Sequence, residues 1–212
     1  MAQRQLRTVM SEFLRNLQEC KRLASDAYQW SLPGAHPHIS RSRRDHLTEM
    51  AFLRAFLAWE VFVEESFVLY LLGQRAPRGR PPVRHAFPPN QRTAMEWVIP
   101  EGRSYASWTV PTHISNRAER FFRDGRPFAD VLRANQTLLD EARIIRNAIA
   151  HKSMSASDKF EAFVRTKLGV LPPNTTVGSF LGTTEAGTAP PVSFLESYVG
   201  KIDTAARLIV PF

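Results

Sequence analysis

Five residues that suit phosphate chemistry lie close together: Arg143, Arg146, Asn147, His151 and Lys152. Arginine and lysine carry the positive charge that binds phosphate oxygens, and a guanidinium does so through a fork of N–H donors. An asparagine amide both donates and accepts hydrogen bonds, and an imidazole gains and loses a proton near neutral pH. These residue types favour chemistry on a phosphate ester.

RNA is the phosphate ester that carries its own nucleophile, because a 2′-hydroxyl lies beside each phosphodiester. Its cleavage needs a base for that hydroxyl, an acid for the departing 5′-oxygen and a cation for the crowded phosphate. We expect His151 to fill either proton-transfer role and Arg146 to hold the phosphate. Asn147, one helical turn before His151, would orient the imidazole or the phosphate, or close the helix end. Arg143 and Lys152 would add phosphate-binding charge, and such a site requires no metal and no cofactor.

One chain supplies only one histidine to this group, whereas the reaction needs both an acid and a base. A twofold homodimer would bring two copies of Arg146, Asn147 and His151 into one cleft. On an ideal helix Arg146 and His151 point about 140° apart, and a facing subunit removes the need for them to converge within one chain. We therefore predict a homodimer.

The same pattern is also typical of an ordinary helix end. A histidine in the last turn is favoured by the helix dipole, and an asparagine there acts as a C-cap. In that case the chain would be a module that binds RNA or a protein without turnover, or a structural subunit whose apolar helix contacts a different protein. These alternatives stay open.

Helical periodicity runs through most of the chain. Apolar residues recur at spacings of three and four from about residue 3 to 30, and the longest periodic run begins with a cap at Asp45 and ends at Gly73. That run has almost no polar face, so it should lie among other helices or against a second subunit. Glu60 and Glu64 are its exceptions. Each is expected to have a cation as its partner, because burying a lone carboxylate is costly.

The rest of the chain predicts shorter helices and two loops. Further helices are expected at 113–123, after Pro127, from a cap at Asn135 through the motif, at 158–167 and after a capping box at Ser193 and Glu196. Residues 169–191 should form a loop. Together these features predict an all-α, single-domain bundle of about five main helices that spans residues 1–212.

The segment 74–95 is rich in proline and arginine and contains no acidic residue. Such a composition predicts a long, exposed basic loop rather than a helix or a central strand. Arg78, Arg80 and Arg84 in this loop would contact RNA or would only be solvated.

Charge and composition narrow the classes of partner. The 212 residues include 28 Lys and Arg against 20 Asp and Glu, a formal net charge of +8, which favours a polyanion such as RNA. The single cysteine, Cys20, excludes an internal disulfide and a zinc site built from several cysteines. Charged residues interrupt the most apolar stretch, 50–72, and residues 1–16 lack the apolar core of a secretory signal. We expect a cytoplasmic protein without membrane association.

Three segments resemble the HEPN superfamily, and its RiboL-PSP-HEPN group in particular. Arg146 and His151 resemble the superfamily signature, an arginine followed after four to six residues by a histidine, with a polar residue after the arginine. Residues 58–64 are similar to the second helix of that group, and residues 116–128 to a further segment of it. The similarity covers about residues 45–152, the expected core of the domain, and more weakly the last helix.

This resemblance implies an α-helical domain that dimerises. Many members are metal-independent endoribonucleases of toxin–antitoxin or anti-phage systems, so an antitoxin or another defence protein is an expected partner. Other members lack nuclease activity and act as binding or scaffold domains. The resemblance therefore implies a homodimeric endoribonuclease, with a non-catalytic RNA- or protein-binding module as the alternative.

Overall fold

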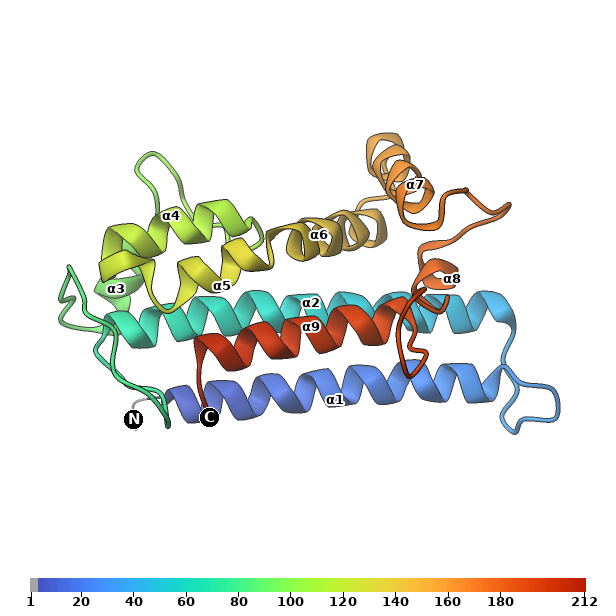
Figure 1. Cartoon of the computed structure of the whole chain (residues 1–212), viewed down its shortest axis with the longest axis horizontal. Helices are drawn as coiled ribbons and strands as arrows, with labels where there is room; N and C mark the ends of the chain where they lie inside the picture. Colours follow the sequence, from blue (N-terminus) through green and yellow to red (C-terminus); the bar gives the residue numbers. More distant parts are fainter. Residues whose placement is uncertain (1–3) are drawn as a thin grey trace. The chain divides into compact units, whose positions relative to one another are not determined.

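Helices make up the regular structure of the chain. The computed structural model describes residues 4–212, and the elements in this range are helical apart from two isolated β-bridges (Figure 1). The helices are α1 (Leu6–Trp30), α2 (Arg41–Leu71), α3 (Gln91–Val98), α4 (Pro111–Phe121), the 3₁₀-helix η1 (Arg123–Gly125), α5 (Phe128–Ala134), α6 (Gln136–Ala150), α7 (Met154–Leu168), α8 (Val177–Leu181) and α9 (Phe194–Ile209). The all-α fold class is confirmed. Among the described residues, no helix has the length and apolar character needed to cross a bilayer.

The described part of the chain has nine α-helices, where the sequence predicted about five main ones. Five of them, α1, α2, α6, α7 and α9, have 15 residues or more. The other four have 5 to 11 residues. The sequence predicted α4 at 113–123 and α5 after Pro127, whereas α3 and α8 are too short for periodicity to separate them from loops. Local caps start two of these: Asn90 accepts a hydrogen bond from the Thr93 N–H at 2.9 Å before α3, and Thr176 and Ser179 form a capping box at α8. Both helices interrupt segments that were expected to be loops.

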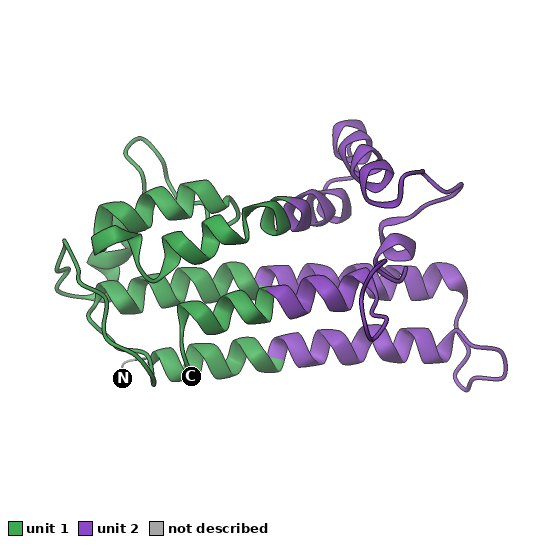
Figure 2. Cartoon of the chain, viewed as in Figure 1, with its two compact units in different colours: residues 1–15, 58–140, 202–212 green, residues 16–57, 141–201 purple. Residues whose placement is uncertain are grey.

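Two compact units make up the chain (Figure 2). Unit 1 comprises residues 1–15, 58–140 and 202–212, and unit 2 comprises residues 16–57 and 141–201. Each unit consists of segments that are far apart in the sequence. The expectation of one domain over residues 1–212, with its core at 45–152, stays a prediction.

Aromatic side chains form the core of unit 1. Phe67 of α2 lies at its centre, with a ring centroid 5.0 Å from those of Phe122 and Phe128. The hydroxyl of Tyr70, one turn later, donates to the Ile209 carbonyl at 2.7 Å and ties the end of α2 to α9. Every aromatic residue of α2 in this unit is buried. The prediction that this helix lies among other helices therefore holds for unit 1.

A second aromatic cluster forms part of the core of unit 2. Phe180 of α8 stacks on Phe194 of α9 with 4.5 Å between ring centroids, and its ring centroid lies 5.3 and 5.8 Å from those of Phe163 and Phe160 in α7. These rings join three helices that come from one end of the sequence. The short helix α8 owes its position to this packing, because a five-residue helix has little stability by itself.

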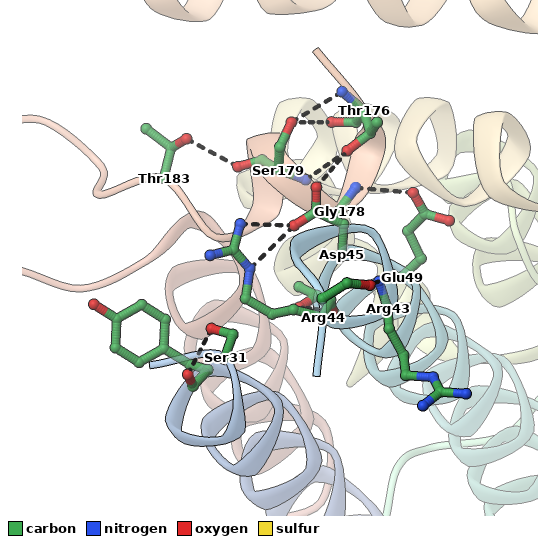
Figure 3. A network of polar contacts seen from close by, with 12 residues as sticks. Ser31, Arg43, Arg44, Asp45, Glu49, Thr176, Gly178, Ser179 and Thr183 are labelled. Atoms are coloured by element: carbon green, nitrogen blue, oxygen red, sulfur yellow. Dashed lines mark hydrogen bonds and ion pairs between the residues drawn. The ribbon is translucent and has the colours of Figure 1, made fainter. Parts of the chain in front are cut away.

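Polar contacts join α8 to the first turns of α2 (Figure 3). The N–H of Gly178 donates to the Glu49 carboxylate at 3.0 Å, and the Thr176 hydroxyl donates to Asp45 Oδ2 at 3.1 Å. Arg44 pairs with the other oxygen of Asp45 at 2.8 Å. The two helices are so close that a Cβ atom on Gly178 would lie 2.6 Å from the Asp45 Cα. Only glycine fits at this crossing.

Asp45 does not cap α2, which corrects the sequence-based prediction. The helix begins at Arg41, and the Ser40 hydroxyl accepts a hydrogen bond from the Arg43 N–H at 3.3 Å. Asp45 lies inside the helix, where Thr176 and Arg44 contact its carboxylate. Ser40, five residues earlier, supplies the side-chain oxygen that caps the helix. Asp45 instead has a partner from a distant segment.

Of the other predicted caps, Asn135 takes the N-cap position of α6, because its carbonyl accepts the first helical hydrogen bond from the Leu139 N–H at 3.0 Å. Its side-chain amide donates back to the Val131 carbonyl at 2.8 Å and so closes α5. The capping box at Ser193 and Glu196 is confirmed, because the Ser193 N–H donates to the Glu196 carboxylate at 2.9 Å and the Glu196 N–H donates to the Ser193 hydroxyl at 3.2 Å.

The basic proline-rich segment before α3 is held to unit 1 by its backbone. The Arg78 N–H donates to the Pro211 carbonyl at 3.1 Å, and the His85 N–H donates to the Phe121 carbonyl at 2.9 Å. Residues 74–90 contain no helix, as their prolines predict. The segment is thus an exposed loop with two anchors.

Candidate active site

The predicted catalytic residues lie at the junction of α6 and α7, in unit 2. Ser153 ends the helical path with an extended backbone (φ −89°, ψ 151°) and caps α7, its hydroxyl accepting a hydrogen bond from the Ala156 N–H at 3.3 Å. The N–H of His151 donates to the Asn147 carbonyl at 2.8 Å, the last helical hydrogen bond of α6. His151 therefore lies just beyond the end of α6, in an exposed connection of three residues.

The structure joins Arg146 to Asn147 and leaves His151 accessible. Arg146 Nη1 donates to Asn147 Oδ1 at 3.2 Å, and both residues are half-buried. The His151 imidazole is exposed and has no side-chain hydrogen bond or ion pair with residues 4–212. Of the two predicted phosphate-binding neighbours, Arg143 is half-buried on α6 and Lys152 is exposed. The junction thus presents a positioned guanidinium and an accessible imidazole.

Glu141 orients α6 within unit 2. Its carboxylate accepts a hydrogen bond from the Tyr198 hydroxyl of α9 at 2.7 Å and pairs with Lys167 of α7 at 2.8 Å. Burial and the hydrogen bond to Glu141 raise the pKa of Tyr198 well above its usual range, so the hydroxyl remains a donor. Ala142 and Ile145 are buried. These contacts set the rotation of α6 and so determine which of its residues reach solvent.

Two helix ends with opposite effects on an anion meet at this junction. The carbonyl end of α6 carries partial negative charge, whereas the first turn of α7 carries partial positive charge and amide N–H groups that bind anions. Lys152 lies between them, and Arg146 lies one turn back on α6. An anion beside His151 would be attracted by α7 and by these two cations. Guanidinium and ammonium groups can bind a phosphate oxygen, and an imidazole can exchange a proton.

The two carboxylates expected to support the site belong to unit 1. Glu60 and Glu64 are both half-buried on α2. Burial raises the pKa of Glu64, the charge of Glu65 raises it further, and the charge of Arg117 lowers it. Arg117 is therefore a cation that acts on Glu64. The expected pairing of Glu60 with Arg146 stays a prediction.

The three arginines of the basic loop have different surroundings. Arg78 and Arg80 are exposed and line a hollow of about 440 Å³ in unit 1, together with Arg123, Asp124 and Arg126. Arg84 instead donates from Nη1 to the Leu71 carbonyl at 2.9 Å, at the end of α2. That contact gives Arg84 a structural role, so Arg78 and Arg80 are the better candidates for contact with RNA.

A second basic cavity in unit 1 was not predicted from the sequence. It has a volume of about 530 Å³, and α4 and the segment 98–107 line it. Its charged residues are Arg103, His113, Arg117 and Arg120. The helical spacing of the last three is a signal that could have revealed one wall. Arg103 comes from an irregular segment whose path no periodic pattern predicts.

Comparisons with known proteins assign no family to the chain. No family model, curated protein or solved structure matches it. In residues 4–212, no three side chains of His, Cys, Asp or Glu come together in a group that could hold a metal ion. Any functional assignment therefore rests on the residues of the chain itself.

Proposed function

We propose that this chain is a metal-independent endoribonuclease that acts as a homodimer, with Arg146, Asn147 and His151 of both subunits in one cleft. The observation that carries the proposal is the α6–α7 junction, where an accessible imidazole follows a guanidinium held by an amide at 3.2 Å. The resemblance to the HEPN superfamily and the net charge of +8 also support it. The sequence features described above place this activity in the cytoplasm in our proposal, and the resemblance alone places it in a toxin–antitoxin or anti-phage system.

In the proposed reaction, His151 of one subunit takes the proton of a 2′-hydroxyl, and the 2′-oxygen attacks the neighbouring phosphorus. The bond from phosphorus to the 5′-oxygen breaks, and the protonated His151 of the second subunit gives its proton to that oxygen. The products are a 2′,3′-cyclic phosphate and a 5′-hydroxyl. Arg146 would stabilise the charge on the non-bridging oxygens, and Asn147 would hold the guanidinium in place.

The test is cleavage of RNA by the pure protein in EDTA. His151→Ala should lower the rate about 10²- to 10⁴-fold, the usual contribution of a general acid or base. Arg146→Ala should lower it as well, while His38→Ala, which removes an exposed histidine from the loop before α2, should not. Cleavage that requires a metal, or that survives His151→Ala, would remove the proposal.

A mixing experiment tests the shared cleft. When equal amounts of wild-type and His151→Ala chains are refolded together, wild-type homodimers form about a quarter of all dimers. A cleft that needs both histidines should then retain about a quarter of the activity of the same total amount of wild-type chain. Independent sites in each subunit would retain about half, and that result would refute the shared cleft.

A second candidate function is RNA binding without turnover. It is favoured by one hollow that Arg78, Arg80 and two further arginines line together. In that case the affinity should fall steeply with salt, and the slope of log affinity against log salt should decrease by about 1 for each phosphate contact removed. Arg78→Ala and Arg80→Ala should each show this decrease. A flat salt dependence would exclude an electrostatic contact.

A further inference from the structure

The basic cavity on α4, which we name the α4 cavity, lies wholly within unit 1. His113, Asn116, Arg117 and Arg120 of α4 line it, at spacings that place them along one side of the helix over two turns. Arg103 lines it from the segment after α3. None of its lining residues is acidic. Three guanidinium groups thus surround a hollow without a carboxylate in its wall.

Arg117 is the positioned member of this group. Only 8% of the residue is exposed, its guanidinium lies 4.5 Å from the centre of the Trp108 ring, and Nη1 donates to the Ser107 carbonyl at 3.2 Å. A guanidinium has five N–H donors, and this is the one hydrogen bond that the Arg117 side chain makes within residues 4–212. Burial lowers its pKa, and the charge of Glu64 opposes that effect. An anion in the cavity would give this partly desolvated cation acceptors for its remaining donors.

The rest of the wall adds an aromatic surface. Tyr105 lines the cavity and is 67% exposed, so its ring is available for stacking. A volume of about 530 Å³ lies within the range of small-molecule sites. Guanidinium forks match phosphate oxygens, and aromatic rings stack on nucleobases. These are the two chemistries that recognise a nucleotide.

We infer that the α4 cavity binds a nucleotide, with its phosphate on Arg103, Arg117 and Arg120 and its base on Tyr105. The nucleotide is either a free mononucleotide or one unit of an RNA strand, which share this chemistry. The inference does not depend on the proposed ribonuclease activity, because the lining residues belong to unit 1 and Arg146, Asn147 and His151 belong to unit 2.

The experiment is titration calorimetry of the full chain with adenosine 5′-monophosphate, adenosine and a short single-stranded RNA. The monophosphate or the RNA should bind, and adenosine should bind at least roughly 10-fold more weakly than the monophosphate because it lacks the charged group. Arg120→Ala should weaken binding roughly 10- to 100-fold, and Tyr105→Ala should weaken it as well. Arg120 and Tyr105 are exposed, so these variants leave the core intact. Arg92→Ala removes an exposed arginine of unit 1 that lies outside the cavity lining, and it should have no effect.

The outcomes separate the two sources and the two proposals. Binding of RNA but not of the monophosphate assigns the cavity to a strand, whereas monophosphate binding that RNA does not displace assigns it to a free nucleotide. The inference would be overturned if neither the monophosphate nor the RNA bound, or if Arg120→Ala and Arg92→Ala weakened binding equally. His151→Ala should bind the monophosphate normally, so a loss of cleavage there leaves the α4 cavity unaffected.

Discussion

Gly178→Ala tests the packing of α8 on α2. The added Cβ would lie 2.6 Å from the Asp45 Cα, and a helix backbone cannot move aside as a flexible side chain can. Overpacking of this kind costs about 1–3 kcal/mol, and a backbone obstacle favours the upper end. Displacement of α8 would also break the hydrogen bond from the Gly178 N–H to Glu49, a loss of about 1.5–3 kcal/mol for a charged acceptor.

The better helix propensity of alanine offsets about 1 kcal/mol of this loss. We therefore expect the free energy of unfolding to fall by about 4 kcal/mol. For a chain of this length, that corresponds to a decrease in Tm of about 8–16 °C. Scanning calorimetry of both proteins in the same buffer gives the difference directly.

Gly200→Ala is the matched control, because it makes the same chemical change in α9 where the added Cβ meets no atom within 4 Å. It should raise the free energy of unfolding by about 0.5–1 kcal/mol through helix propensity alone. An unchanged or increased Tm for Gly178→Ala, with the expected increase for Gly200→Ala, would refute the close crossing of α8 and α2.

Two further predictions concern titratable groups whose pKa burial shifts. Burial raises the pKa of Glu64 above its ordinary value of 4.5, so the folded chain holds this proton more tightly than the unfolded chain. The resulting contribution to stability is complete below pH 4.5 and is lost as pH rises through the folded pKa. Urea unfolding at a series of pH values should show this loss in the wild type and not in Glu64→Gln. If the free energy of unfolding of the wild type, minus that of the variant, increased with pH, the prediction would be contradicted. Burial also raises the pKa of the Cys20 thiol to about 11. A thiol-reactive disulfide at about pH 8 should therefore label the native chain roughly 100-fold more slowly than the urea-unfolded chain, and equal rates would show that Cys20 is accessible.

The candidate site shows how far local signals extend. The polar residues around position 146 were identifiable from their types and spacing, and the contact between Arg146 and Asn147 joins sequence neighbours. The end of α6 was also determined by the neighbouring sequence, because Ser153 caps the next helix within four residues. Which residues of α6 face solvent was not local, since Tyr198 and Lys167 hold Glu141 from distant helices.

The sequence by itself determined the helical class, the approximate extent of the long helices and the helix-free, exposed character of the basic loop over residues 74–90. Apolar spacing, proline and capping residues act within a few positions, and the start of α9 at Phe194 follows from its neighbours Ser193 and Glu196. Only the tertiary structure decided which polar groups meet. Asp45 contacts Thr176 across 131 positions, and Arg103 joins the arginines of α4 through an irregular segment. Such contacts depend on the path of the whole chain, which no spacing along the sequence records.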